Sequence, residues 1–288
     1  MRASLIQIAV DPYESADSRR QRAAALVRGQ RGSDLVVLPE LWPVGAFAYE
    51  SFAQEAEAVD GPTFEVMSKA ASDAGVWLHA GSVVERDSDG TLYNTSLVLS
   101  PAGELVGTYR KIHRFGFDKG EATMMGAGEE LVTVPLSLSG GADGDGGGGA
   151  DEGGGADGGG TTTIGLATCY DLRFPELFRG LVDAGASLLV IPAGWPARRR
   201  AHWTLLAQAR AVENQSYVLA CATAGTHAGV EQSGHSIVVD PWGEVLAEAG
   251  ADEEVLTVDL DPARVATTRE QFPALKDRRL GLTTPPRR

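Results

Sequence analysis

Three residues with complementary chemistry, Glu40, Lys111 and Cys169, each follow a short apolar stretch that is typical of a buried strand. A cysteine thiolate is a nucleophile for covalent catalysis. A carboxylate beside it can accept the thiol proton and return a proton to a leaving amine. A lysine and a backbone N–H can stabilise the negative charge that builds on a tetrahedral oxygen. Gathered in one pocket, these side chains would suit attack on an amide or related C–N carbon, and that reaction requires neither a metal nor a phosphate.

The segment around Cys169, residues 165–177, reads as a strand, a turn and then a helix. A thiol at such a junction lies near helix N–H groups, whose partial positive charge favours the thiolate. The other interpretation of a single cysteine is a small buried hydrophobe. We predict that second role for Cys221, which lies within an apolar strand at residues 217–222.

Three segments in this order resemble the nitrilase-like carbon–nitrogen hydrolase superfamily. The matching stretches are residues 38–40, 109–113 and 169–176, and residues 201–203 and 210–215 also look like family segments. The resemblance covers the chain from the first strand to about residue 260 and implies a Glu-Lys-Cys triad. In that triad Glu40 is the general base, Lys111 stabilises the oxyanion and Cys169 is the nucleophile. The backbone N–H of Tyr170 is implied as the second oxyanion donor.

The family usually carries a second active-site glutamate between the lysine and the cysteine. The candidates in this chain are Glu121, Glu129 and Glu130. We choose Glu121, because residues 126–130 read as the turn that follows it. The other interpretation of Glu121 is an exposed loop acid.

The residues after the nucleophile, Tyr170 and Asp171, are similar to the amidase branch of the superfamily. Its nitrilases tend to have tryptophan directly after the cysteine, and its carbamoylases often have asparagine. The amidase branch includes enzymes acting on the side-chain amide of small 2-oxo acids, such as 2-oxoglutaramate, and on deaminated glutathione. The resemblance therefore implies release of ammonia from a small carboxylate-bearing amide through a thioester on Cys169.

A carboxylate-bearing substrate would need a local cationic lining, since the chain as a whole is acidic. Arg173 is either a carboxylate anchor or a salt-bridge partner within the turn that carries the nucleophile, and we expect the structural role. Two further functions stay open. One is an N-carbamoyl-amino-acid hydrolase or a nitrilase on the same scaffold, and the other is a non-catalytic redox-sensing or scaffold protein.

Strands alternate with helices along the chain, which predicts an α/β fold. The resemblance implies more specifically a four-layer α-β-β-α sandwich in one domain spanning residues 1–288. We predict strands at residues 5–10, 34–38, 76–84, 92–99, 105–109, 131–138, 161–167, 187–191, 217–222, 236–239, 244–247 and 255–258. We predict helices at residues 16–30, 63–74, 175–184 and 201–214 and a short one after Pro262.

One segment breaks this alternation. Residues 140–160 contain 13 glycines and five acidic residues, with no apolar side chain larger than alanine. Such a composition cannot bury enough surface to offset its ordering entropy, so we predict a disordered loop insertion between two neighbouring strands. A tail with several prolines and arginines ends the chain.

The composition excludes several classes of partner. The formal net charge is −14, and the arginine runs at residues 198–200 and 278–279 are too short to hold a phosphate backbone, so we expect no nucleic acid. Only two cysteines are present, and no apolar run approaches the length of a membrane span, which favours a cytoplasmic protein without a membrane partner. His227 and His235 show no metal-ligand spacing, so we expect no metal and no cofactor. The resemblance implies a homodimer formed through the helices at residues 174–184 and 201–214.

Overall fold

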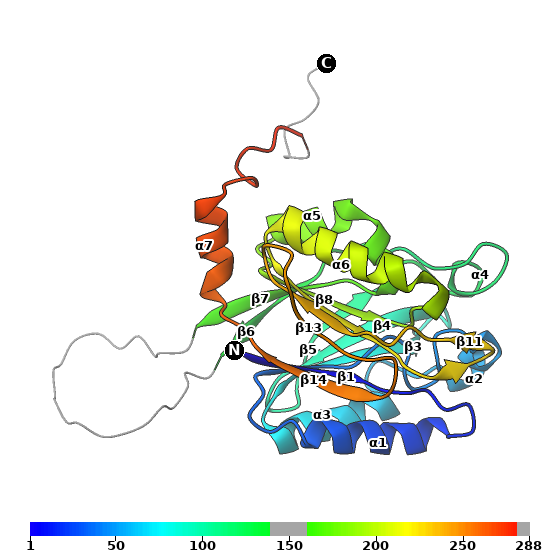
Figure 1. The fold of residues 1–288 in the computed structure, drawn as a ribbon. Helices are drawn as coiled ribbons and strands as arrows, with labels where there is room; N and C mark the ends of the chain where they lie inside the picture. Colours follow the sequence, from blue (N-terminus) through cyan, green and yellow to red (C-terminus); the bar gives the residue numbers. More distant parts are fainter. Residues whose placement is uncertain (139–159, 281–288) are drawn as a thin grey trace, which may run out of the picture.

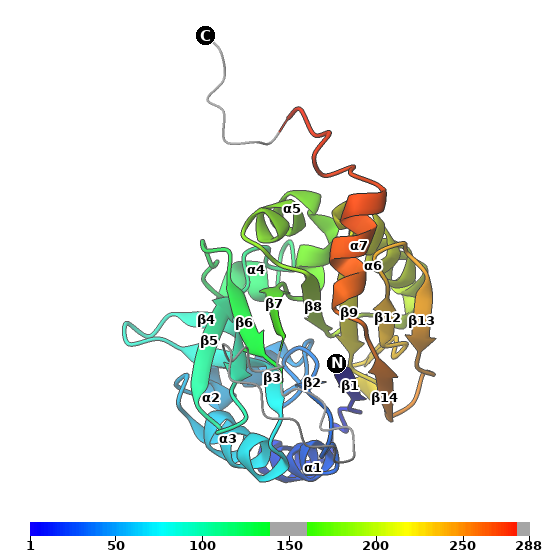
Figure 2. The same ribbon diagram turned by 90° about the vertical axis from the view of Figure 1, so that its left-hand side faces the viewer.

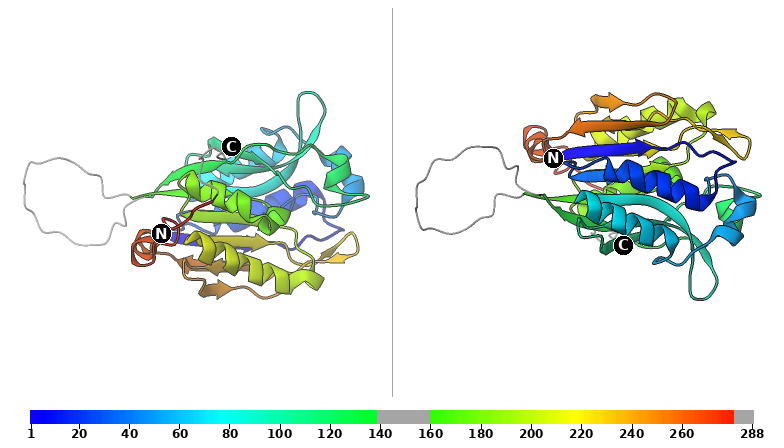
Figure 3. Two further views of the ribbon diagram at one scale, coloured as in Figure 1. Left: turned by 90° about the horizontal axis from the view of Figure 1, so that it is seen from above. Right: turned by 90° about the horizontal axis from the view of Figure 1, so that it is seen from below.

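The computed structural model describes residues 1–138 and 160–280, in which two six-stranded sheets pack face to face. Helices α1 (Ala16–Arg28) and α3 (Pro62–Ala74) cover the outer face of the first sheet. Helices α5 (Pro175–Asp183) and α6 (Arg200–Asn214) cover the outer face of the second (Figure 1). The views from above and below place these two helical layers on opposite sides of the molecule (Figure 3). The predicted four-layer α-β-β-α sandwich is confirmed.

The first sheet has the strand order β14-β1-β2-β3-β4-β5. Its strands are β1 (Arg2–Gln7), β2 (Leu35–Val37), β3 (Trp77–Arg86), β4 (Leu92–Leu99), β5 (Leu105–Arg110) and β14 (Glu254–Asp259). Strands β1, β2 and β3 run parallel, and the other pairs are antiparallel. All three residues of β2 are buried, as expected for a strand covered on both faces.

The second sheet has the order β13-β12-β9-β8-β7-β6. Its strands are β6 (Thr133–Ser137), β7 (Thr161–Leu166), β8 (Leu188–Ala193), β9 (Tyr217–Ala222), β12 (Ile237–Val239) and β13 (Val245–Glu248). Strands β7, β8 and β9 are parallel, so the segments that follow them leave the sheet at one edge. A small hairpin of β10 (Thr226–His227) and β11 (Val230–Glu231) lies beyond β9.

Several short elements complete the chain. They are η1 (Tyr49–Ser51), α2 (Phe52–Glu55), α4 (Glu121–Met124), η2 (Cys169–Arg173), η3 (Ala197–Arg199) and α7 (Ala263–Gln271). Figure 2 shows α7 along one edge of the sandwich, beside β9 and β14. In the described residues no helix is both long and apolar enough to cross a bilayer.

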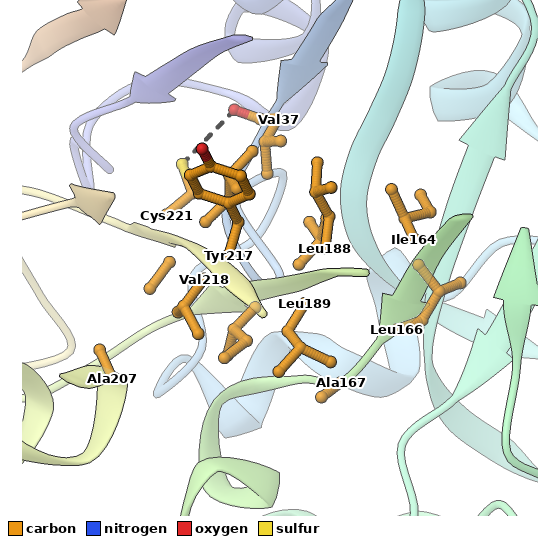
Figure 4. Packing of buried hydrophobic residues seen from close by; sticks show 14 of the residues in the cluster. Val37, Ile164, Leu166, Ala167, Leu188, Leu189, Ala207, Tyr217, Val218 and Cys221 are labelled. Atoms are coloured by element: carbon orange, nitrogen blue, oxygen red, sulfur yellow. Dashed lines mark hydrogen bonds between the residues drawn. The ribbon is translucent and has the colours of Figure 1, made fainter. Parts of the chain in front are cut away.

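Apolar side chains from both sheets fill the space between them. Val37 of the first sheet belongs to the same buried cluster as Leu166, Leu189 and Val218 of the second. Cys221 is completely buried there, and its thiol lies 3.4 Å from the carbonyl oxygen of Val37 (Figure 4). Burial raises the pKa of the Cys221 thiol. The predicted structural role of Cys221 agrees with this environment.

The element bounds differ from prediction mainly at strand ends. The first strand was expected at residues 5–10 but covers Arg2–Gln7, because all six of its residues pair with β14 from Arg2↔Asp259 to Gln7↔Glu254. The start of β1 is therefore set by its backbone pairing with β14 rather than by the beginning of the apolar run. The short elements at residues 49–55 and 121–124 were not predicted, since one turn of helix has no hydrophobic periodicity to detect. The predicted insertion at residues 140–160 and the final tail fall almost entirely outside the described residues.

Candidate active site

Both sheets contribute to one pocket. Glu40 follows β2 and Lys111 follows β5, which are strands of the first sheet, whereas Cys169 follows β7 of the second sheet. The fold therefore brings together Glu40, Lys111, Cys169 and Glu121, as the sequence predicted. The pocket is lined by Glu40, Ala46, Phe47, Tyr49, Lys111, Phe115, Glu121, Cys169, Tyr170, Arg173, Gly194, Trp195, Pro196 and Arg199.

Lys111 is buried between two carboxylates. Its Nζ donates to Oε1 of Glu40 at 2.6 Å and to Oε2 of Glu121 at 2.6 Å, and each of the three residues is at most 3% exposed. Burial by itself lowers the pKa of Lys111, but the charges of Glu121 and Glu40 outweigh it and raise the pKa well above its ordinary value. The ammonium group is therefore held charged and in a fixed position at the base of the pocket.

The two carboxylates are also held by neutral donors. Nδ2 of Asn94, on β4, donates to Oε1 of Glu40 at 2.8 Å and also to Glu121. The backbone N–H of Gly194, which follows β8, donates to Oε2 of Glu40 at 2.7 Å. The Phe115 N–H donates to Oε2 of Glu121 at 2.8 Å. Burial raises the pKa of Glu121, while Lys111 opposes that shift. Glu121 is thus a buried member of the cluster, and its interpretation as an exposed loop acid is wrong.

Cys169 opens a 3₁₀ turn in a left-handed conformation, with φ at +48°. A non-glycine residue adopts this region at an energetic cost, and such strain is concentrated at functional sites. The side chain is 8% exposed, and its Sγ lies 3.8 Å from the carbonyl oxygen of Gly194. Leu41, directly after Glu40, is also left-handed, at φ +44°. Both Cys169, the proposed nucleophile, and the residue beside the proposed base are therefore held in strained backbone.

Burial and the nearby charge of Glu40 raise the pKa of the Cys169 thiol well above its ordinary value, although Lys111 opposes them. The prediction that N–H groups of the following helix favour a resting thiolate is therefore wrong. A single 3₁₀ turn follows the cysteine, and its N–H groups do not outweigh desolvation and a neighbouring carboxylate. A base beside the thiol would promote its deprotonation.

The turn that carries Cys169 is fixed by Asp171, whose side chain is completely buried. The Asp171 carboxylate accepts hydrogen bonds from the Thr168 N–H at 2.8 Å and from the Tyr109 hydroxyl at 2.7 Å. His113 lies against it through both its backbone N–H, at 3.0 Å, and Nδ1, at 2.8 Å. The His113 ring stacks on Phe174 with centroids 3.7 Å apart.

Two arginines lie at the pocket, and neither forms an ion pair within the part of the chain that the structure describes. The guanidinium group of Arg173 lies over the Trp195 ring at 5.0 Å, and that of Arg199 lies over Phe115 at 5.3 Å. Burial and the charges of Arg198 and Arg173 lower the pKa of Arg199. The predicted salt bridge of Arg173 within the turn is therefore wrong, because its side chain lines the pocket instead.

Other residues singled out in the sequence lie outside this pocket lining. Trp203 is fully buried, and its Nε1 donates to the His235 carbonyl oxygen at 2.8 Å, so its role is structural. His202 contacts Arg173 at 3.4 Å on the exposed side. Among the described residues, no three His, Cys, Asp or Glu side chains are grouped so as to hold a metal ion.

Sequence reasoning gave no functional role to three residues that the structure brings to the site: Asn94, Asp171 and Arg199. Asn94 is the one amide in an otherwise apolar and hydroxylic strand, and a buried amide needs partners. Asp171 lies in the segment around Cys169, where it served only to indicate the amidase branch of the superfamily. Arg199 belongs to a run of three arginines that was considered only as a site for a phosphate backbone, for which it is too short.

Comparison with known proteins identifies relatives of this chain. A 2-oxoglutaramate amidase from Paenarthrobacter nicotinovorans is 41% identical over 277 residues, covering 95% of this chain and 88% of that protein. Omega-amidase NIT2-B from Xenopus laevis is 35% identical over 285 residues, covering 98% and 96%.

Among solved structures, XC1258 from Xanthomonas campestris, described as a CN-hydrolase superfamily protein with an arsenic adduct in the active site, matches with a TM-score of 0.82. Its sequence is 30% identical, and the match covers 97% of each chain. The family model of carbon-nitrogen hydrolases matches residues 2–270. The resemblance inferred from the sequence is confirmed, and the chain belongs to the carbon–nitrogen hydrolase family.

Proposed function

We propose that this protein hydrolyses the C–N bond of a small amide that carries a carboxylate, and that it releases ammonia through a thioester on Cys169. The observation that carries the proposal is the buried ion cluster of Glu40, Lys111 and Glu121 beside the buried thiol of Cys169. A carboxylate, a fixed cation and a nucleophile in one pocket are what acyl transfer requires. Relatives named as amidases support the amide as the substrate.

The first half of the reaction forms the thioester. Glu40 takes the proton of the Cys169 thiol as Sγ attacks the amide carbonyl carbon. The C=O electron pair moves onto oxygen, where Nζ of Lys111 and the backbone N–H of Tyr170 stabilise the charge. The intermediate collapses as Glu40 returns the proton to nitrogen, so the C–N bond breaks and ammonia leaves.

The second half regenerates the thiol. Water replaces ammonia in the pocket and attacks the thioester carbonyl, while Glu40 accepts a proton from it. The C–S bond breaks, the carboxylic acid leaves, and Cys169 regains a proton from Glu40. Glu121 accepts hydrogen bonds from Lys111 and from the Phe115 N–H, which supports a role in holding the lysine rather than in transferring the proton.

Arg173 and Arg199 are our proposed anchors for the substrate carboxylate. Both line the pocket, and neither has a carboxylate partner among residues 1–138 and 160–280. Two uncompensated guanidinium groups favour an anion, and bidentate contact with a carboxylate is the geometry that arginine suits best. This local lining supplies the attraction that the acidic chain as a whole does not. A free thiol as nucleophile fits the cytoplasmic location expected from the sequence.

The test is ammonia release from a panel of small ω-amides, including 2-oxoglutaramate, by the wild type and by Cys169→Ala. Activity on a carboxylate-bearing amide that is abolished in the variant supports the proposal. Release of carbon dioxide together with ammonia from N-carbamoyl amino acids would indicate an N-carbamoyl-amino-acid hydrolase instead. Consumption of a nitrile without turnover of any amide would indicate a nitrilase. Failure of Cys169→Ala to abolish turnover would contradict the thiol mechanism.

We also propose that the chain forms a homodimer through the outer face of α6. Leu205 and Val212, two helical turns apart, are 64% and 51% exposed, and Trp242 and Phe272 form a nearby exposed aromatic pair. A row of large apolar side chains on an outer helix is typical of an interface. Leu205→Glu should shift the protein from dimer to monomer in analytical ultracentrifugation, whereas a wild-type monomer would contradict this proposal.

A further inference from the structure

The carboxylate of Asp171 joins the two halves of the pocket. It is completely buried and accepts hydrogen bonds from Tyr109 and His113, which flank Lys111 by two residues on each side. It also accepts from the N–H of Thr168, which precedes Cys169. A carboxylate can only accept, so Nδ1 of His113 carries the proton of that contact. One side chain thus contacts both the lysine segment and the nucleophile turn.

These two segments belong to different sheets. Tyr109 lies on β5 at the edge of the first sheet, and Asp171 follows β7 of the second. Between the sheets, most contacts are apolar and therefore have no preferred direction. A hydrogen-bonded carboxylate does have a preferred direction and length, so it can fix how one sheet edge lies against the other. The contact occurs beside the pocket, where that relative position decides the chemistry.

The relative position matters because the nucleophile and the cation act on the same carbonyl group. Sγ of Cys169 bonds to the carbon while Nζ of Lys111 stabilises the oxygen, and displacement of one against the other by a fraction of an ångström weakens the stabilisation. Lys111 is held by Glu40, which follows β2 of the first sheet, and by Glu121 of α4. Glu40 in turn accepts from the N–H of Gly194, which follows β8 of the second sheet, and Asp171 relates the lysine segment directly to the turn of Cys169.

We propose that Asp171 is a positioning residue. Through its hydrogen bonds with Tyr109 and His113, it fixes the position of Lys111, the cation that stabilises the oxyanion, relative to the nucleophile, Cys169. This inference rests on the proposed acyl-transfer function but does not depend on which amide is the natural substrate. It predicts that loss of a hydrogen bond to Asp171 slows reactions that build charge on a carbonyl oxygen. Reactions of the same thiol that build no such charge should change much less.

Two reagents separate these reactions at Cys169. With p-nitrophenyl acetate, Sγ attacks the carbonyl carbon, the thiol proton passes to Glu40, and p-nitrophenolate leaves as the C–O bond breaks, so an oxyanion must be stabilised. With iodoacetamide, Sγ displaces iodide at a saturated carbon, and no oxyanion forms. Both reactions need the same deprotonation. The ratio of the acylation rate to the alkylation rate therefore separates the stabilisation of the oxyanion from the deprotonation of the thiol.

Two matched pairs of variants test the proposal. Tyr109→Phe removes a donor to Asp171, and its control Tyr217→Phe removes a hydroxyl that donates to the Asp261 carbonyl oxygen from an equally buried tyrosine. His113→Ala removes the Nδ1 donor, whereas Nδ2 of an asparagine in His113→Asn can occupy the same place. Both His113 variants lose the stack on Phe174, so they differ mainly in the hydrogen bond.

We expect Tyr109→Phe and His113→Ala to lower the ratio about tenfold, and Tyr217→Phe to leave it within about twofold of wild type. His113→Asn should restore most of the loss. Urea unfolding tests whether Tyr109→Phe and Tyr217→Phe lower the free energy of unfolding by similar amounts.

Equal ratios in the two tyrosine variants, or an unchanged ratio in His113→Ala, would overturn the role of Asp171. The role would also be overturned if acylation of the wild-type protein by p-nitrophenyl acetate did not depend on Cys169. If the ratios behave as expected but no amide yields ammonia, the proposed substrate class fails while the positioning role stands.

Discussion

Nδ2 of Asn94 lies 2.8 Å from Oε1 of Glu40, the carboxylate oxygen that also accepts from Lys111. The same amide nitrogen donates to Glu121, so one neutral side chain bridges the two acids on either side of the lysine. Asn94 is 2% exposed and lies on β4, between the strands that lead to Glu40 and Lys111. The proposed base therefore depends on an asparagine for its orientation as well as on the lysine.

Asn94→Ala should lower kcat at least about tenfold, because a hydrogen bond to a buried charged group contributes roughly 1.5–3 kcal/mol. Asn214→Ala is a matched control. Asn214 is also buried and also donates through Nδ2, but it lies on α6. Within residues 1–138 and 160–280 its Oδ1, like that of Asn94, has no hydrogen-bond partner. Steady-state ammonia release measures both variants, and an equal kcat in the two would argue against a role for Asn94 in orienting the base.

Lys111→Met should abolish turnover and also destabilise the fold by about 3–5 kcal/mol, because two buried carboxylates lose their cation. Lys69→Met is the control, since Lys69 is 69% exposed in its pair with Asp73 and such surface pairs contribute little.

The stability of Lys111→Met should depend on pH in a definite direction. Without the cation, burial raises the pKa of Glu121 further in the folded state, which then binds more protons than the unfolded state. The variant should therefore become less stable relative to wild type as pH rises from about 5 to 8. A constant difference across this range in urea unfolding would contradict a buried ion cluster.

Arg173→Gln and Arg199→Gln should each raise KM for a carboxylate-bearing amide about tenfold or more, because a charged hydrogen bond to the substrate is lost. KM for a neutral amide of the same length should change little. Arg198→Gln is the matched control, because Arg198 is the adjacent arginine but does not line the pocket. If the neutral and anionic substrates respond alike, the arginines shape the pocket without binding the carboxylate.

Iodoacetamide should label Cys169 and leave Cys221 unmodified in the folded protein, because Cys221 is completely buried. Since the pKa of the Cys169 thiol is raised, the labelling rate should keep increasing between about pH 7 and 9. Mass spectrometry of peptides after timed labelling measures both rates. A rate that is already constant below neutral pH would indicate a stable thiolate and would contradict the raised pKa.

Acid should destabilise the fold through His79, a fully buried residue of β3. Burial lowers its pKa to about 4, whereas the unfolded chain protonates near the ordinary value of 6.5. Between these values the unfolded state binds the additional proton, so stability is complete above about pH 6.5 and is lost as pH falls towards about 4.

His79→Gln should flatten this dependence in urea unfolding measured across that range. The exposed His202 provides the control variant His202→Gln, which should keep the wild-type slope. The same slope in all three proteins would show that His79 does not govern the acid sensitivity.

Local patterns predicted the alternation of strands and helices, and the family resemblance implied the four layers and the proposed triad. Apolar runs such as residues 35–37 and 217–222 specify buried strands, and the segments around Glu40, Lys111 and Cys169 follow such strands. Glu121 could be selected from its position in the chain alone. Its burial could not be predicted, because it depends on a short helical turn packed against Lys111.

The pairing of side chains across the two sheets was beyond sequence reasoning. Asp171 meets Tyr109 at a separation of 62 residues, and Glu40 meets Gly194 at a separation of 154 residues. The thiol pKa was predicted in the wrong direction for the same reason. The neighbouring helix is visible in the sequence, whereas the burial of Cys169 and its closeness to Glu40 follow from three-dimensional packing.

The β6–β7 hairpin has a practical consequence for protein engineering. Ser137 pairs with Thr161, and the Leu138 N–H donates to the Gly160 carbonyl oxygen at 2.9 Å. Leu138 and Gly160 thus lie side by side at the start of β7 (Figure 1), whereas Cys169 follows the other end of this strand. A fluorescent reporter or an affinity handle spliced between these positions would begin and finish at adjacent points. Immobilised or labelled forms of the enzyme could be built there with the pocket left open.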